Sequence, residues 1–228
     1  MIKLHELADA GGRHYSTFSW RTRLALAHKG LAWQSVPVKV SDKAAIAFSG
    51  QKKVPIITDG ERVVYDSWKI AEYLEDTYPE RPSLFGGETG RSLARFFNSY
   101  ADRQLVGSLF PALMLENVGL LATDDAAHIR AGMEKPLGKT LEELAAGREQ
   151  AQKAFSRALD PVRSVLRAQP YVSGAKPAYA DYILFSVFQW ARITTTTPIA
   201  AADDPLWPWF DRLLDSFDRL GRNEPART

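Results

Sequence analysis

The stretch VPIITDGERVVYDSWKIAEYLEDTYP, residues 54–79, contains two short β-branched runs followed by a segment with helical spacing of its apolar residues. Asp59 and Gly60 join the two runs, and an Asp-Gly pair in this position is a strong signal for a hairpin turn. In residues 67–78 the apolar side chains recur every three or four positions, as on one face of a helix: Trp68, Ala71, Leu74 and Tyr78. The stretch therefore predicts a β-hairpin that leads directly into a helix.

The residues before this stretch predict a strand, a helix and a second strand. IKLHEL, residues 2–7, alternates as a strand does, and a helical pattern begins at Ser16 and ends near Gly30. AWQSVPVKV, residues 32–40, is typical of a strand, and Pro37 favours a sheet edge because proline lacks an N–H. With the hairpin and its helix, this order predicts a mixed sheet covered by helices, as in the thioredoxin-like α/β fold.

The second half of the chain predicts an all-helical domain. Residues 79–90, PERPSLFGGETG, are rich in proline and glycine, so we expect a linker at 81–90 between a first domain, 1–80, and a second, 91–228. Pro111 should kink or break the first helix of the second domain. Helical patterns cover residues 91–118, 125–147, 149–168, 179–192 and 205–220.

Composition narrows the possible functions. The formal net charge is only +2 and no long basic run occurs, so nucleic acid is a poor candidate partner. No apolar stretch approaches the roughly 20 residues that span a bilayer, and the first residues lack a signal-peptide pattern. We therefore expect a cytoplasmic protein that binds neither nucleic acid nor membrane.

The absence of cysteine restricts the chemistry further. It excludes disulfides, thiolate metal sites and a cysteine nucleophile supplied by the chain itself. The four histidines have no ligand-like spacing, so no metal site is expected. Thiol chemistry remains open to this protein only if a bound small molecule brings the sulfur.

Three small hydroxyl residues, Ser16, Thr17 and Ser19, crowd the start of the first helix. A single serine there is usually a cap whose oxygen accepts a backbone N–H, and one cap would be enough. A helix N-terminus also carries partial positive charge and unpaired N–H donors. Such a setting stabilises a thiolate, to which a serine hydroxyl can donate a hydrogen bond. Sequence alone leaves open which hydroxyl would do so.

Two further features of residues 52–67 each allow a plain structural interpretation and a binding one. Pro55 could be an ordinary edge proline, although a proline at this point of a thioredoxin-like fold is typically cis and leaves the backbone of Val54 free for a ligand. Asp66 and Ser67 could simply cap a helix, or they could bind the ammonium and carboxylate of an amino acid. Together these features indicate a site for a peptide-like molecule with a thiol at its centre.

The sequence resembles the glutathione S-transferase family, of the serine type. Its S-x-x-x-W-R-T spacing and its C-terminal end are similar in particular to bacterial glutathione-dependent β-aryl etherases and their fungal relatives. The resemblance spans nearly the whole chain and is carried by four segments: STFSWRTRLALAHKG, KKVPIITDGERVVYDSWKIAEYLEDTYPERPSLFG, YVSGAKPAYADYILFSVFQW and DDPLWPWFDRLLDSFDRLGR.

The resemblance implies a role for each residue of the glutathione site. Ser16 would donate to the glutathione sulfur and stabilise its thiolate. Val54, beside cis-Pro55, would pair through its backbone with the cysteinyl unit. Asp66 and Ser67 would hold the γ-glutamyl end.

The resemblance also implies a lysine contact and a structural aspartate. Lys53 or Lys52 would meet the glycine carboxylate. Asp181 would brace the helix that begins near Tyr179, but Ala178 stands where the family usually has a hydroxyl or amide cap. That departure puts the local helix cap in doubt rather than the site.

The second substrate would be a hydrophobic electrophile in a cleft between the domains. Aromatic residues at helical spacing are more often plain core, so only some of the candidates should line this cleft. The candidates are Phe18, Phe110, Met114, Trp190 and Trp207.

The resemblance implies that the protein is an enzyme, a homodimer that transfers glutathione to the electrophile, with cleavage of a β-aryl ether as one possible reaction. Thiol–disulfide and dehydroascorbate reductases of the same fold use a cysteine where Ser16 stands, so the absence of cysteine argues strongly against them. A non-catalytic glutathione-binding or regulatory protein of the same fold is the other alternative.

Overall fold

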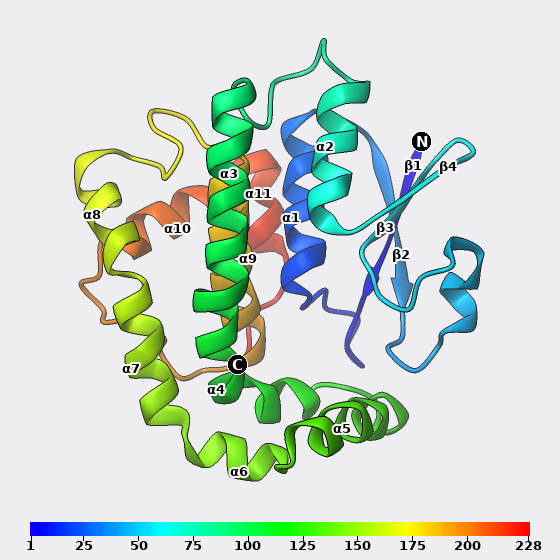
Figure 1. Cartoon of the computed structure of the whole chain (residues 1–228), viewed down its shortest axis with the longest axis vertical. Coiled ribbons are helices and arrows are strands. Elements are labelled where there is room, and N and C mark those ends of the chain that lie inside the picture. The colour runs from blue at the N-terminus through cyan, green and yellow to red at the C-terminus, as the bar shows by residue number, and fades with distance from the viewer.

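A four-stranded mixed sheet with two helices on one face forms the first part of the chain, and a bundle of helices forms the second (Figure 1). The computed structural model describes all residues, 1–228. The strands are β1 (Ile2–Leu7), β2 (Trp33–Val38), β3 (Ile56–Asp59) and β4 (Arg62–Tyr65). The predicted thioredoxin-like α/β domain followed by a helical domain is confirmed.

The sheet has the strand order β2-β1-β3-β4. β1 pairs with β2 in parallel and with β3 in antiparallel orientation, and β3 and β4 form the predicted hairpin. Gly60 adopts a φ of +57° in its turn, a conformation that glycine reaches without steric cost. The edge position predicted for the proline-containing strand is confirmed, because β2 has only one neighbour.

Helix α1 (Thr17–His28) lies at the centre of the molecule, between the sheet and the helical domain (Figure 1). Trp20 and Leu24 are fully buried, and most of the remaining residues of α1 are buried as well. Helix α2 (Ser67–Thr77) buries Trp68, Ala71 and Leu74 of the predicted apolar stripe, whereas Tyr78 follows the helix and is half-buried. Residues at the start of α1 are therefore positioned by rigid, packed structure.

The helical domain follows a connection at residues 78–87. None of its helices, nor any other in the chain, combines the length and apolar character needed to cross a bilayer. Its elements are α3 (Glu88–Tyr100), a π-helical segment (Ala101–Val106), α4 (Gly107–Val118), α5 (Thr123–Leu137), α6 (Leu141–Ala146), α7 (Arg148–Ala158), α8 (Asp160–Ala168), α9 (Tyr179–Thr194), α10 (Leu206–Leu214) and α11 (Ser216–Asn223).

Helix boundaries in this domain differ from the prediction in identifiable ways. Pro111 does not end its helix, and α4 continues to Val118. The helical backbone is irregular instead one turn before Pro111, in the π-helical segment. The wider turns of that segment interrupt the regular series of backbone hydrogen bonds. The segment predicted at 125–147 is two helices, since Gly138 ends α5 in a left-handed conformation and Thr140 begins α6 with a capping box.

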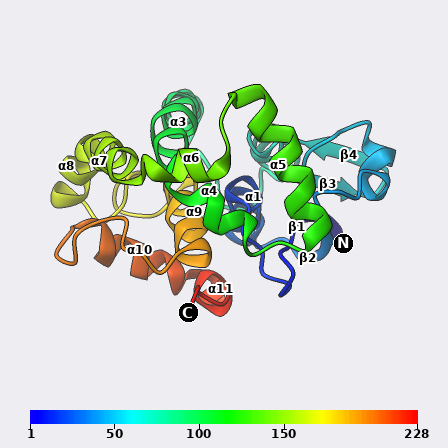
Figure 2. The ribbon, with the colours of Figure 1, turned by 90° about the horizontal axis from the view of Figure 1, so that it is seen from below.

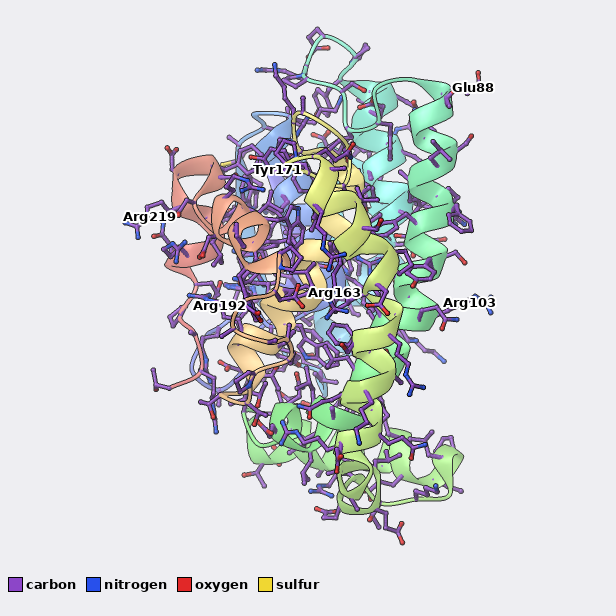
Figure 3. All side chains as sticks on the ribbon, turned by 90° about the vertical axis from the view of Figure 1, so that its left-hand side faces the viewer. Glu88, Arg103, Arg163, Tyr171, Arg192 and Arg219 are labelled. Carbon is purple, nitrogen blue, oxygen red and sulfur yellow. The ribbon has the colours of Figure 1, made fainter.

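The two other long helical patterns are also divided. Asp160 and Pro161 begin α8 immediately after α7, because proline suits a first helical turn and not an interior. Arg163 of α8, labelled in Figure 3, binds Asp204 before α10 at 2.8 Å and so ties these segments together. The last pattern divides at Asp215, between α10 and α11.

Asp181 organises the N-terminus of α9, the most deeply buried helix of the domain. Its carboxylate is fully buried and accepts hydrogen bonds from the N–H groups of Val172, Ser173 and Ala178 at 2.7–3.2 Å. It also accepts from the indole of Trp209 at 2.9 Å. Ala178 contributes its N–H to this arrangement but has no side-chain oxygen to return the bond.

The missing hydroxyl leads to a stability prediction. Ala178→Ser should raise the free energy of unfolding by about 1 kcal/mol, because a serine oxygen can cap the first turn of α9. Urea denaturation of the two proteins measures the difference. An unchanged or lower stability would mean that the existing bonds of Asp181 already satisfy this helix end.

Candidate active site

Ser16 is the N-cap of α1 and lines a cavity of about 550 Å³. Its hydroxyl oxygen accepts one long hydrogen bond, 3.4 Å, from the N–H of Ser19. The N–H groups of Thr17 and Phe18, in the first turn, have no partner within the protein. A helix N-terminus with free donors and a hydroxyl thus faces this cavity, a setting that favours negative charge.

The structure separates Ser16 from the other hydroxyl groups of its segment. Thr17 and Ser19 are buried and do not line the cavity, and the Ser19 hydroxyl has no hydrogen-bond partner. Tyr15 packs into the core, where burial raises the pKa of its phenol far above the ordinary value. Ser16 is therefore the only hydroxyl group of residues 15–19 that faces the cavity.

The backbone of Val54 offers an unpaired donor and an unpaired acceptor beside the same cavity. The Val54–Pro55 peptide is cis. The N–H and C=O of Val54 precede β3 and make no hydrogen bond within the protein. Val54 lines both the Ser16 cavity and a second cavity of about 370 Å³. Free backbone groups of this kind can pair with an extended peptide ligand in the manner of an added strand.

Asp66 and Ser67, at the start of α2, also line the second cavity. Asp66 has a φ of +71°, a left-handed conformation that costs energy for a residue with a side chain and that aspartate tolerates better than most. Its Oδ1 accepts the N–H groups of Trp68 and Lys69, each at 3.1 Å. The predicted capping role is thus present, and Oδ2 remains available.

Ser67 is buried but keeps its hydroxyl and N–H free of protein partners. Its carbonyl oxygen accepts the hydroxyl of Tyr179 from α9 at 2.8 Å. This contact fixes the N-terminal end of α2 against the helical domain. The Asp66–Ser67 corner therefore presents one carboxylate oxygen, one hydroxyl and one helix-terminal N–H, which suits an ammonium beside a carboxylate.

The two cavities adjoin, since Phe18, Lys53 and Val54 line both of them. Phe18 is 39% exposed and also borders a larger depression of about 1070 Å³ between α2 and α3. We call the two adjoining cavities the groove: Ser16 lines the first, Ser67 lines the second, and Val54 lines both. The residues predicted for the cysteinyl and γ-glutamyl contacts thus line this groove.

Lysines dominate the charge of the groove near Ser16. Lys39, Lys43, Lys52 and Lys53 all line the first cavity, and no acidic residue does. Lys53 also lines the second cavity, whereas Lys52 does not. This favours Lys53 over Lys52 as the nearer charge to a ligand that extends through both cavities.

Of the residues predicted to line the hydrophobic site, Phe18 alone lies on the groove. On α4, Met114 belongs to the core of the helical domain, and Phe110 is partly buried against that core. Trp190 of α9 is 5% exposed, and its indole donates to Asn117 at 2.8 Å. Trp207 borders a separate cavity near the C-terminus. These four residues do not line the groove: Phe110, Met114 and Trp190 pack within the helical domain from α4 and α9, and Trp207 lies on α10.

Helix α5 supplies the apolar wall that sequence reasoning missed. His128, Ile129 and Met133 line the first cavity, with Val38, Val40 and Ile46 from the sheet side. In Figure 2, α5 lies beside the ends of β1 and β2. Asp125, 3% exposed, fixes the helix there by accepting the N–H of Ser41 at 2.7 Å. The available signal was the Ile129–Met133 pair on an otherwise polar helix.

Comparison with known protein families agrees with this geometry. Residues 92–218 match the glutathione S-transferase C-terminal domain, and residues 12–82 match the glutathione S-transferase N-terminal domain. These matches cover both halves of the chain. The protein belongs to the glutathione S-transferase family.

Two curated plant proteins are similar to this chain. The probable glutathione S-transferase parA of Nicotiana tabacum is 31% identical over 40% of this chain, and the match spans 43% of the tobacco protein. Glutathione S-transferase U17 of Arabidopsis thaliana is 24% identical over 80% of this chain and 73% of its own length.

Two solved structures of similar fold come from fungi. Glutathione transferase GSTFuA3 from Phanerochaete chrysosporium has a TM-score of 0.85 and 26% identity, with 96% of each chain covered. Glutathione S-transferase CsGST63524 of Ceriporiopsis subvermispora, solved in complex with glutathione, has a TM-score of 0.82, 22% identity and the same coverage. At this identity the second likeness concerns the fold.

Proposed function

We propose that this protein is a serine-type glutathione S-transferase that activates the glutathione thiol and transfers it to a hydrophobic electrophile. The observation that carries the proposal is the pair of adjoining cavities lined by Ser16 and by Ser67, with the unpaired backbone groups of Val54 beside both. Family membership and the glutathione complex of a fungal relative support it.

In this proposal glutathione lies extended along the groove. Asp66 and Ser67 hold its γ-glutamyl end, and the Val54 backbone pairs with the cysteinyl unit beside Pro55. Lys53, with Lys52 as the alternative, neutralises the glycine carboxylate. This orientation directs the sulfur toward the first turn of α1.

The chemical step then depends on Ser16. The thiol gives its proton to solvent, and the thiolate accepts a hydrogen bond from the Ser16 hydroxyl in the field of the helix N-terminus. The sulfur attacks an electrophilic carbon held against Phe18 and the α5 wall. With a β-aryl ether the C–S bond forms as the C–O bond breaks, and the departing phenolate takes a proton from water.

The ether reaction defines the finer proposal, and a comparison of substrates tests it. We expect release of a phenol from an aryl ether with a neighbouring ketone, in stoichiometric amount with the glutathione conjugate. A general aryl halide serves as the reference electrophile. Turnover of the halide without phenol release would reject ether cleavage and retain the transferase.

Ser67→Ala should weaken glutathione binding by about tenfold, corresponding to the loss of one hydrogen bond to a charged group. Calorimetric titration of glutathione measures the change. Ser92→Ala is a suitable control, since Ser92 of α3 lines neither of the two cavities that form the groove. Unchanged affinity in Ser67→Ala would contradict the proposed γ-glutamyl contact.

We also propose that the protein is cytoplasmic and forms a homodimer. Support for the dimer comes from exposed apolar side chains that a partner subunit could cover. They are Val63 and Tyr65 on the edge strand β4, and Leu93 and Phe96 on α3. Sedimentation analysis is the test. A monomer of 25.4 kDa across the working concentration range would reject the dimer.

A further inference from the structure

The segment just after α11 contacts the loop that leads into Ser16. Glu224 is 8% exposed, and its Oε1 accepts the backbone N–H of His14 at 2.9 Å. Its Oε2 lies 3.1 Å from Nδ1 of the His14 ring. These bonds join residues 210 positions apart in the sequence. A single carboxylate therefore holds both the backbone and the side chain of a residue two positions before Ser16.

His14 is held from its other sides as well. Its Nε2 lies 3.1 Å from the hydroxyl of Ser35 on β2, and its carbonyl oxygen accepts the indole N–H of Trp20 at 2.5 Å. In the preceding turn Asp9 accepts the N–H groups of Gly11 and Arg13, and the Ala10 N–H donates to the carbonyl oxygen of Leu120 at 3.2 Å. The Glu224 carboxylate thus provides the only acceptor for the His14 N–H.

Charge in this region is balanced by buried partners. Glu6, fully buried, receives two hydrogen bonds of 2.7 Å from Arg23, whose guanidinium also lies 3.8 Å from Glu224. Burial would raise the pKa of the Glu224 carboxyl, but hydrogen bonds from His14 and the charge of Arg23 outweigh it and lower the pKa. Glu224 is therefore a charged, strong acceptor at neutral pH.

The tail that carries Glu224 is anchored independently of this side chain. Arg192 of α9, labelled in Figure 3, donates to the carbonyl oxygen of Glu224 at 2.8 Å, and Gln189 donates to that of Gly221 at 2.8 Å. Truncating the Glu224 side chain removes neither contact. Its effect on the His14 loop can thus be separated from undocking of the tail.

Within α1, Ser16 is held through its carbonyl oxygen, which accepts the N–H of Trp20 at 3.0 Å. Its own hydroxyl has only the 3.4 Å bond from Ser19, and the position of its oxygen follows from the backbone at residues 14–16. We propose that Glu224 is a positioning residue for Ser16: the C-terminal tail fixes the loop before α1 and so places the hydroxyl that stabilises the glutathione thiolate. This inference rests on the proposed function of Ser16.

The test uses the full-length protein with Glu224→Ala and Glu224→Gln. We expect Glu224→Ala to lower kcat by about tenfold, because a small misplacement of a reacting group is costly. The pKa of the bound glutathione thiol should rise, while the KM for glutathione changes little because Val54, Asp66 and Ser67 are untouched. Glu224→Gln should recover part of kcat, since its amide oxygen can still accept the His14 N–H.

A chain that ends at Pro225 is the matched control, since it loses three tail residues but keeps Glu224; we expect kcat and thiol pKa near those of the wild type. Wild-type kcat and thiol pKa in Glu224→Ala would overturn the inference. So would equal losses in Glu224→Ala and in the control chain.

If the wild-type protein itself shows no lowered thiol pKa, the proposed function fails instead, and the two failures are thereby distinguished. If Glu224→Ala does not fold, an unaltered thiol pKa in Glu224→Gln together with unaltered kcat overturns the inference.

Discussion

Ser16→Ala should lower kcat for glutathione transfer by about 10²- to 10³-fold, the usual cost of removing one donor to a developing or stabilised anion. The bound thiol should lose most of its stabilisation, and its pKa should rise toward about 8.5, the ordinary value for a thiol. Steady-state kinetics and thiolate ultraviolet absorbance measure the two effects. Glutathione affinity should change little, because the γ-glutamyl and backbone contacts lie elsewhere in the groove.

Ser19→Ala is the matched control for this prediction. Ser19 belongs to the same segment, but it is fully buried, its hydroxyl has no partner, and only its backbone N–H reaches Ser16. We expect activity near that of the wild type. Comparable losses in both variants would show that the segment, rather than the Ser16 hydroxyl, carries the effect.

Asp181→Ala should cause the largest loss of stability, about 4 kcal/mol or more. Its carboxylate is fully buried and accepts four hydrogen bonds, three from backbone N–H groups and one from Trp209. Each donor left without an acceptor in a buried position costs on the order of 1 kcal/mol or more. Denaturant unfolding measures the free energy.

An exposed aspartate provides the comparison for Asp181. Asp203, in the loop before α10, makes no hydrogen bond through its side chain, and Asp203→Ala should be close to neutral. Asp181→Asn should lie between the two, since an amide oxygen keeps part of the acceptor capacity. A loss below about 1 kcal/mol in Asp181→Ala would mean that water replaces the carboxylate at this helix end.

The elements of the first domain were predictable because each has a local signal. Alternating or β-branched runs, the Asp59–Gly60 turn and the stripe of α2 specify strands and helices within a few residues. The divisions at Gly138 and at Asp160–Pro161 were missed because apolar spacing continues across them. Only the left-handed conformation of Gly138 and the fit of a proline in a first turn divide the helices there.

The two walls of the groove differ in how far sequence could define them. Ser16, Val54 and Ser67 stand at element junctions, where a motif and the fold together indicate a location. The apolar wall depends instead on how α5 lies against the sheet. One of the contacts that fix this placement is the Asp125–Ser41 hydrogen bond, which joins residues far apart in the sequence. Trp190, although aromatic and well spaced, is required by the core and bonded to Asn117. Side-chain type alone cannot distinguish these two uses.

The pKa of the thiol in the protein–glutathione complex decides whether the Ser16 site activates glutathione. Thiolate absorbance is followed as a function of pH with wild-type protein in excess over glutathione. The proposed site predicts a pKa well below about 8.5, near neutrality, because the α1 N-terminus and the Ser16 hydroxyl favour the anion. A bound thiol with the same pKa as free glutathione would contradict the account.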